Sequence, residues 1–179
     1  MPAQWTARPA TPADVEPIAE LRAVVLRADL ERLGRFDEHR VRQRLRDSYT
    51  PRHTTVILAA GTFAGCVALR PAGPERWLEH FYLDPALQGR GIGTAVLRTV
   101  LRDADGLPVR LNVLQGSAAL RLYERHEFVV QTQDPVDVFM LRPPASAAAL
   151  SGRAGAGAAS TTAGPDRRTA AASAPPPAT

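Results

Sequence analysis

The chain has 179 residues, of which 45% are hydrophobic, a size and composition typical of one globular domain with a substantial core. Its formal net charge is +4 at pH 7, but all 22 basic side chains are arginine, which excludes any mechanism that needs a lysine from this chain. No run of about 18 apolar residues occurs and no basic segment followed by an apolar stretch opens the sequence, so we expect no membrane partner and a cytoplasmic protein.

The first predicted element with clear boundaries is a helix near the N-terminus. Thr11 can cap this helix, Pro12 suits its first position and Asp14 favours its positive end. An apolar face follows at helical spacing, made of Ile18, Leu21 and Val25.

The second predicted helix, residues 37–47, is strongly charged. Val41 and Leu45 form its apolar face, and its arginines are typical of the solvated side of a helix. Because the arginines of the chain are mostly not gathered on one face without acidic neighbours, we do not expect nucleic acid as the partner.

Apolar patterns and turn residues predict the remaining elements. Gly61 separates two strands as in a tight hairpin, and Cys66, inside the second of them, is expected to fill core space. Pro85 ends a third strand because it cannot donate to a sheet. The elements are strands 54–60, 62–70 and 76–83, a helix 91–104, a strand 109–114, a helix 117–125, and short strands 128–132 and 137–141. This order predicts an α/β domain with a mixed sheet.

The end of the sequence, residues 143–179, consists almost wholly of Ala, Pro, Gly, Ser and Thr. Such a composition cannot bury enough apolar surface to offset the entropy lost on ordering. We therefore expect a folded domain at residues 3–142 and a disordered tail at residues 143–179.

The loop at residues 88–94, between the third strand and the following helix, is the most informative segment. Gly89, Gly91 and Gly93 let consecutive backbone N–H groups turn toward one point without Cβ clashes. The positive end of the helix dipole and the Arg90 side chain add to the attraction for an anion. The loop therefore predicts a site for a phosphate or pyrophosphate group.

Spacing separates this interpretation from others. A dinucleotide fingerprint needs a third glycine where this chain has Thr94 or Val96, depending on which glycine is counted first. A P-loop needs a lysine, which the chain lacks. A glycine-rich turn that binds nothing stays open as the structural alternative.

The pattern QxxGxG at residues 88–93, directly after a strand that ends in Asp84-Pro85, resembles the signature of the GNAT superfamily of acetyl-CoA-dependent N-acetyltransferases. The segments LYERHEF (residues 122–128) and ARPATPADVEPIAEL (residues 7–21) are also similar to that family, so the resemblance covers about residues 6–142. It implies a mixed central sheet, mostly antiparallel, splayed between the fourth and fifth strands and flanked by helices.

The resemblance implies acetyl-CoA as the cosubstrate, with its pantetheine arm between the splayed strands and its pyrophosphate on the glycine-rich loop. No metal is expected, and the histidines lack the spacing of metal ligands. The cofactor-binding residues implied in this way are Phe81, Tyr82, Leu83, Gln88, Gly89, Arg90, Gly91, Ile92, Gly93, Thr94, Ser117 and Tyr123.

Two positions depart from the family's pattern. Ser117 stands where relatives often carry Asn, and we expect it to cap its helix and to reach the cofactor less far. Glu127 stands where the family usually has glycine. If the backbone there is left-handed, a side chain costs about 1 kcal/mol, so slight strain is expected.

The resemblance also implies catalytic groups for acetyl transfer to an amine. The backbone N–H of Leu83 is expected to stabilise negative charge on the thioester oxygen, and Tyr123 to protonate the departing thiolate, although a purely packing role stays open for Tyr123. Glu79 is the first choice of base, because alternation puts it on the same sheet face as Phe81 and Leu83. His80 is the second choice, if a bulge exchanges the faces. A water chain without a protein base stays open.

The acceptor is expected between the first two helices and the final hairpin, where several acids could attract a cationic amine: Glu31, Asp37, Glu38, Asp134 and Asp137. A small amine and a protein amino group are both open, as is a homodimer. A non-catalytic acyl-CoA-binding module is the rival function, and a nucleic-acid-binding domain is the third class.

Overall fold

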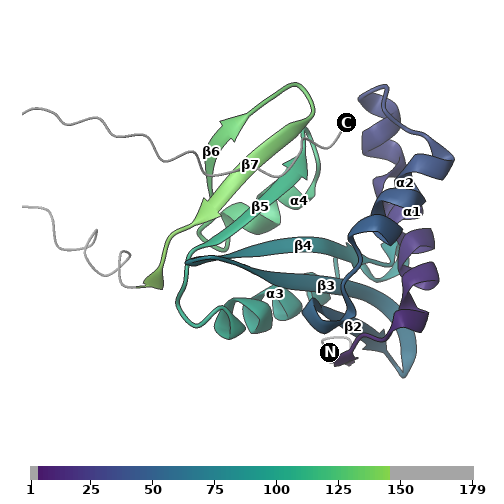
Figure 1. The fold of residues 1–179 in the computed structure, drawn as a ribbon, viewed down its shortest axis with the longest axis horizontal. Helices are drawn as coiled ribbons and strands as arrows, with labels where there is room; N and C mark the ends of the chain where they lie inside the picture. The colour runs from purple at the N-terminus through teal and green to yellow at the C-terminus, as the bar shows by residue number, and fades with distance from the viewer. Residues whose placement is uncertain (1–3, 146–179) are drawn as a thin grey trace, which may run out of the picture.

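One mixed sheet of seven strands forms the centre of the protein, whose computed structural model describes residues 4–145 (Figure 1). The strand order is β1-β2-β3-β4-β5-β7-β6, and all neighbouring pairs are antiparallel except β4 and β5. The strands are β1 (Trp5–Pro9), β2 (Thr54–Ala59), β3 (Thr62–Ala72), β4 (Glu75–Leu83), β5 (Val109–Leu114), β6 (Val129–Gln133) and β7 (Asp137–Arg142). The predicted α/β fold with a mostly antiparallel sheet is confirmed.

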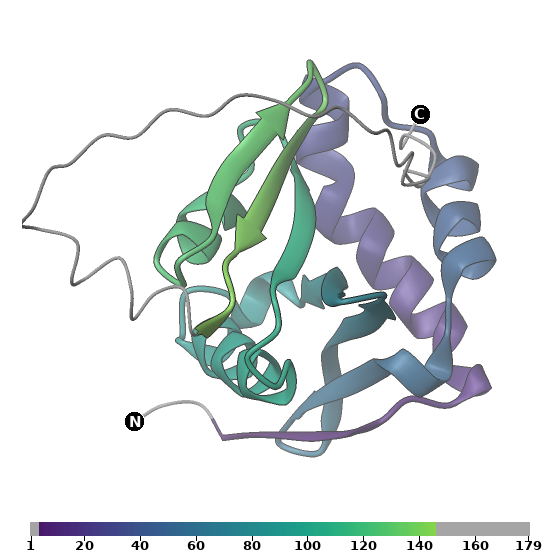
Figure 2. The ribbon, with the colours of Figure 1, turned by 60° about the vertical axis from the view of Figure 1, so that its left-hand side comes forward.

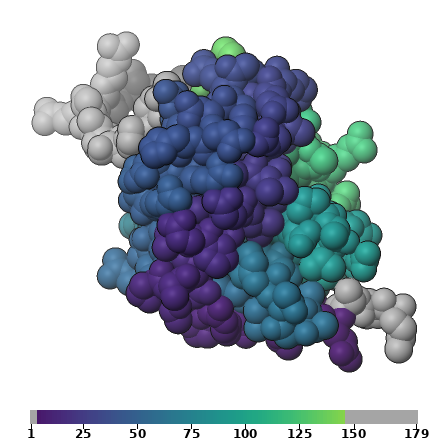
Figure 3. Space-filling model, turned by 90° about the vertical axis from the view of Figure 1, so that its right-hand side faces the viewer, coloured from purple at the N-terminus to yellow at the C-terminus, as the bar shows by residue number. Residues whose placement is uncertain are grey.

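Helices cover both faces of this sheet (Figure 2). One face carries α1 (Val15–Arg32) and α2 (Glu38–Ser48), and the other carries α3 (Ile92–Asp103) and α4 (Ala119–Glu124). Figure 3 shows the purple and blue surface of α1 and α2, which lie side by side as an outer layer. None of the described helices combines the length and the apolar character that a membrane crossing requires.

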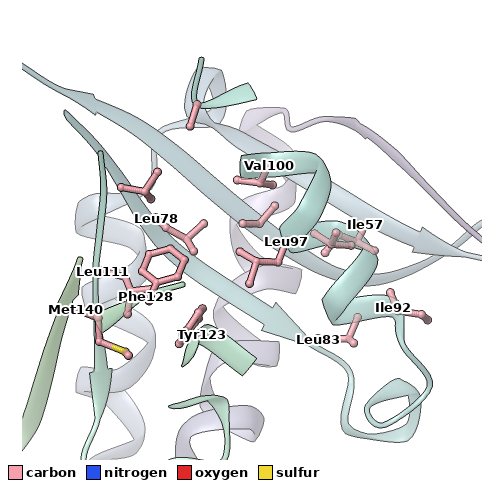
Figure 4. Close-up of a cluster of buried hydrophobic side chains, with 14 of the residues drawn as sticks. Ile57, Leu78, Leu83, Ile92, Leu97, Val100, Leu111, Tyr123, Phe128 and Met140 are labelled. Carbon is pink, nitrogen blue, oxygen red and sulfur yellow. The ribbon is translucent and has the colours of Figure 1, made fainter. Parts of the chain in front are cut away.

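Each face of the sheet has its own apolar cluster. The larger cluster joins the sheet to α3 and α4 and includes Leu97, Leu111 and Phe128 (Figure 4). The smaller one joins Ile18 of α1 to Cys66 of β3. Cys66 is fully buried, as expected, and this burial raises the pKa of its thiol to about 12.

Local sequence signals account for several element boundaries. Asp37 caps α2 by accepting a hydrogen bond from the backbone N–H of Arg40 at 2.7 Å. Ala60 and Gly61, both with positive φ, form the turn of the β2–β3 hairpin. Glu127 has a φ of +67°, so a residue other than glycine adopts the left-handed backbone conformation here, as expected. The predicted tail lies outside the described residues from residue 146 onward.

The sheet opens between β4 and β5. These two strands pair only where Arg76 meets Val109 and Trp77 meets Arg110. An ion pair between Glu75 and Arg110 closes the same end. From residue 78 onward β4 keeps β3 as its neighbour but has no strand on its other side within residues 4–145. The predicted splay between the fourth and fifth strands is therefore confirmed.

A β-bulge distorts β4 beside this opening. His80 has a φ of +50°, and the register with β3 shifts between the pair Cys66–Tyr82 and the pair Ala68–Glu79. On the facing strand, a Cβ at Gly65 would lie 2.3 Å from the carbonyl oxygen of Tyr82, so only glycine fits there. The lack of a side chain at Gly65 thus lets β3 approach the backbone of β4 at Tyr82.

Candidate active site

The glycine-rich loop has the geometry of an anion site. Gly89 and Gly91 adopt φ values of +74° and +82°, and α3 begins directly after them. The first helical hydrogen bond runs from the N–H of Ala95 to the carbonyl of Gly91 at 3.0 Å, so the N–H groups of residues 92–94 precede it and lack intrahelical partners. Arg90 is exposed beside them. The structure thus brings together the loop groups that the sequence predicted.

Gln88 holds this loop against the end of β4. Its side-chain Nε2 donates to the carbonyl of Leu83 at 2.9 Å, a contact that sequence reasoning did not foresee. The neighbouring N–H of Asp84 donates to Ala64 of β3 at 2.8 Å. Because backbone groups alternate in direction along a strand, the N–H of Leu83 points away from β3 and into the opening. The Leu83 side chain packs in the core near Ile92 (Figure 4).

Tyr123 lies on α4 with its ring in the core and its hydroxyl toward a cavity. The ring packs edge-on against Phe128, with 5.6 Å between centroids, and only 7% of the residue is exposed (Figure 4). Burial raises the pKa of its hydroxyl well above the ordinary value. No residue in the range 4–145 hydrogen-bonds this hydroxyl, so its proton is available to a bound molecule.

Ser117 lies two residues before α4, whose N-cap position is Ala118 and not Ser117 as expected. Its Oγ still accepts a hydrogen bond from the N–H of Ala119, the first helical residue, at 3.3 Å. Ser117 also belongs to the wall of the cavity that contains the Tyr123 hydroxyl.

Glu79 and His80 lie on the same face of β4, toward α1 and α2. Phe81 and Leu83 pack instead with the cluster on the α3 and α4 side, whereas Tyr82 packs with the α1 cluster. The expectation that Glu79 shares a face with Phe81 and Leu83 is therefore wrong, because the bulge at His80 interrupts the alternation. Both Glu79 and His80 still line the cavity. Glu79 accepts a hydrogen bond from Arg70 at 3.1 Å.

His80 is held at both ring nitrogens. Arg22 donates to the Tyr82 hydroxyl, whose own proton then points to His80 Nδ1 at 3.3 Å. The hydroxyl of Ser48 donates to a carbonyl of α2, so it accepts from His80 Nε2 at 3.2 Å. Burial, followed by the charges of Arg22 and Arg70, lowers the pKa of His80 to about 4. His80 is thus neutral near pH 7, with its lone pair already used.

A cavity of about 540 Å³ lies against the opening between β4 and β5. Its wall comes from α1, α2, β4, β5, the start of α4 and the turn before β7. It contains Glu79, His80, Phe81, Ser117 and Tyr123. The loop at residues 88–94 is not part of this wall. The glycine-rich loop and this cavity are thus separate, and both adjoin β4.

Comparison with known proteins agrees with this arrangement. The profile of the acetyltransferase (GNAT) family matches residues 19–128. The chain belongs to the GNAT family. Both the predicted family and an acyltransferase activity are thereby confirmed. A search among curated protein sequences gives no match.

Solved structures with the same fold share little sequence with this GNAT chain. PaiA N-acetyltransferase from Thermoplasma acidophilum, in complex with coenzyme A, has a TM-score of 0.64 and 19% identity, covering 78% of this chain and 99% of that one. Ribosomal-protein-S18-alanine N-acetyltransferase from Escherichia coli has a TM-score of 0.62 and 18% identity, covering 79% and 94%. N-acetylglutamate synthase from Neisseria gonorrhoeae, complexed with coenzyme A and L-arginine, has a TM-score of 0.56 and 16% identity, covering 80% and 34%.

Proposed function

We propose that this GNAT protein transfers the acetyl group of acetyl-CoA to a primary amine by direct attack of the amine on the thioester. The observation that carries the proposal is the unpaired edge of β4, which begins beside the cavity that contains Tyr123 and ends at the glycine-rich loop, so that it offers a path between the two. The folded domain that we assign to this activity is residues 3–142.

The chain's own groups fit acetyl-CoA at both ends of this path. The N–H groups of residues 92–94 and the exposed Arg90 suit the pyrophosphate, and a Cβ at Gly89 or Gly91 would meet nothing within 4 Å, so the loop is open to a ligand. The backbone groups of Phe81 and Leu83 face the opening, where they can pair with an extended amide-containing arm. Bound there, acetyl-CoA supplies the activated acetyl group.

Two groups support the chemical step. The N–H of Leu83 is a fixed donor for negative charge that develops on the thioester oxygen. Tyr123 keeps its proton because burial raises its pKa, and it can give that proton to a departing thiolate.

Glu79 is the better placed acceptor for the amine's proton. One of its carboxylate oxygens bonds Arg70, which leaves the other without a partner among the described residues, facing the cavity. His80 is less suited, because both ring nitrogens already have partners and its pKa is low. We therefore assign to His80 the task of fixing the bulge against α2.

Direct attack, without an acetylated enzyme, agrees with the nucleophiles that the chain contains. Its one cysteine, Cys66, is buried, donates to the carbonyl of His80 at 3.1 Å and has a raised pKa, so little thiolate forms. The chain has no lysine.

The proposal is tested by calorimetry with coenzyme A and by thiol release from acetyl-CoA with a broad panel of amines. We expect coenzyme A to bind and at least one amine to give an N-acetyl product identified by mass spectrometry. Incubation without an amine should leave the protein's mass unchanged. Binding of coenzyme A with no product from any amine would instead identify a non-catalytic acyl-CoA-binding module.

A further inference from the structure

Arginines line the acceptor side of the cavity, on α1, on α2 and between them. Arg22 is engaged within the chain, since it donates to the carbonyl of Val41 at 2.8 Å and to the Tyr82 hydroxyl. The other three arginines of this wall take part in none of the ion pairs found within residues 4–145, and their guanidinium groups have no hydrogen-bond partner there. We call these three residues the arginine cluster: Arg35, Arg40 and Arg44.

Within α2, the arginines without a guanidinium partner are those on the side that meets the cavity. Arg42 and Arg46, on another side of the same helix, pair with carboxylates of α1 at 2.7 and 2.8 Å. Arg40 and Arg44 lie one turn apart and both reach the cavity wall.

The arginine cluster places positive charge at the rim of the cavity, where Arg35 and Arg40 are exposed to solvent. Arg44 is half-buried, and its burial, together with the charges of Arg22 and Arg40, lowers the pKa of its guanidinium. Guanidinium groups that repel one another at the edge of a cavity are stabilised when an anion binds between them.

The carboxylates of the wall form no ion pair with the arginine cluster, although Asp37 interacts electrostatically with Arg40, and Asp137 with Arg44. Those in the wall each accept a hydrogen bond: Asp29 from Arg32, Asp37 from the backbone of Arg40, Glu79 from Arg70 and Asp137 from Asn112. Burial raises the pKa of Asp137, while the hydrogen bond from Asn112 and the charge of Arg44 act in the opposite direction. Of the other acids predicted to attract a cationic amine, Glu31 and Glu38 pair with arginines and Asp134 accepts from backbone N–H groups.

We propose that the acceptor amine carries an oxyanion group, a carboxylate or a phosphate, which binds to Arg35, Arg40 and Arg44. The inference rests on the proposed function, because this anion site and the groups that act on the amine share one cavity. The planar guanidinium fork matches the oxygens of carboxylates and phosphates. A volume of about 540 Å³ is typical of small-molecule sites, so we take the acceptor to be a small molecule.

Matched pairs of amines, which differ in the anionic group, test the proposal. The pairs are L-alanine with L-alaninamide, L-phenylalanine with L-phenylalaninamide, and O-phosphoethanolamine with ethanolamine, with spermidine as a cationic probe. Two quantities are measured for each amine: kcat/KM with acetyl-CoA, and the affinity for the protein saturated with coenzyme A, by calorimetry. For at least one pair, both quantities should be roughly tenfold to hundredfold higher for the anionic probe than for its neutral partner. A difference in the amino-acid pairs indicates a carboxylate, and a difference in the ethanolamine pair indicates a phosphate.

Two double variants of α2 locate the effect. The double variant Arg40→Gln and Arg44→Gln should have nearly the same kcat/KM and the same affinity for an anionic probe as for its neutral partner, so that each ratio is close to one. Arg42→Gln with Arg46→Gln removes as much charge from the same helix and should leave the ratio unchanged. Both proteins should bind coenzyme A as the unmodified protein does, which shows that they fold.

The outcomes separate this inference from the proposed function. If each neutral partner binds and reacts as well as its anionic counterpart, or if spermidine is preferred, the anion site is overturned while acetyl transfer stands. If an anionic probe binds in a way that needs Arg40 and Arg44 but no amine is acetylated, the anion site stands and acetyl transfer falls. The anion site is also overturned if the control variant, with Arg42→Gln and Arg46→Gln, loses the preference for anionic probes to the same extent.

Discussion

At the residue scale, Tyr123 combines two properties that a proton donor needs. Its ring is fixed by packing against Phe128, and its hydroxyl reaches the cavity without a hydrogen-bond partner in the described part of the chain. Burial raises its pKa, so the proton stays on the oxygen at neutral pH. A tyrosine that only filled space in this helix would gain nothing from its hydroxyl.

Replacement of Tyr123 by Phe tests this role. The variant should keep its stability and its affinity for coenzyme A, because the hydroxyl has no structural partner, but kcat should fall by about 100-fold through loss of the general acid. Thiol release measures kcat, and calorimetry measures the affinity. Tyr49→Phe is the matched control. It loses a hydroxyl that donates to the carbonyl of Thr11 at 2.7 Å, so about 1 kcal/mol of stability should be lost with turnover intact. Undiminished turnover in Tyr123→Phe would remove the residue from the mechanism.

The residues of β4 show where sequence reasoning stops. Alternation along a regular strand predicted the face of Glu79, but the bulge at His80 reversed it. A bulge is an alternative that the sequence leaves open for His80, but no local signal requires one. The contacts that hold the bulge, to Ser48 and Tyr82, come from packing against α2 and could not be found without the fold.

At the element scale, the entrance of α3 was predictable because its cause is local. Glycine is the residue that adopts positive φ without strain, and a helix start supplies free N–H groups whatever surrounds it. The side of α2 that carries Arg40 and Arg44 was not predictable in the same way. The sequence pattern predicted that both arginines lie on the solvated side of the helix. Only the contact between α1 and α2 shows which arginines form ion pairs.

Gly91→Ala tests whether the loop conformation itself binds the pyrophosphate. A side chain at a φ of +82° costs about 1 kcal/mol, so the loop should relax and the affinity for coenzyme A should fall roughly tenfold. Gly73→Ala, at a φ of +62° in the turn between β3 and β4, imposes the same strain far from the loop. Both variants should lose similar stability in denaturant, and calorimetry should show weaker binding only for Gly91→Ala. Equal affinities would mean that the loop does not hold the cofactor.

At the scale of the whole molecule, the order of the elements could be predicted from local patterns of apolar and turn residues. The splay of the sheet and the family were predicted from the resemblance to the GNAT superfamily. The strand order beyond β5 and the walls of the cavity depend on long-range packing. Within residues 4–145, the two parts of the sheet are joined by only two residue pairs of β4 and β5 and by the ion pair of Glu75 with Arg110, and the core under α3 and α4 supports them. A ligand in the opening would therefore connect parts that the backbone leaves apart.

Hydrogen exchange with and without coenzyme A tests this connection. At a concentration of 100 times Kd, binding stabilises the bound state by about 2.7 kcal/mol, which slows exchange by roughly 100-fold wherever opening requires release of the ligand. Protection should rise for the amides of residues 81–83 in β4, at 111–113 in β5 and at 92–94 in the loop. The edge strand β6 is exposed along its length and exchanges by local fraying, so its amides should not change. Protection limited to the loop would show that the ligand binds there without bridging the sheet, and the assignment of β4 and β5 to the pantetheine arm would then be wrong.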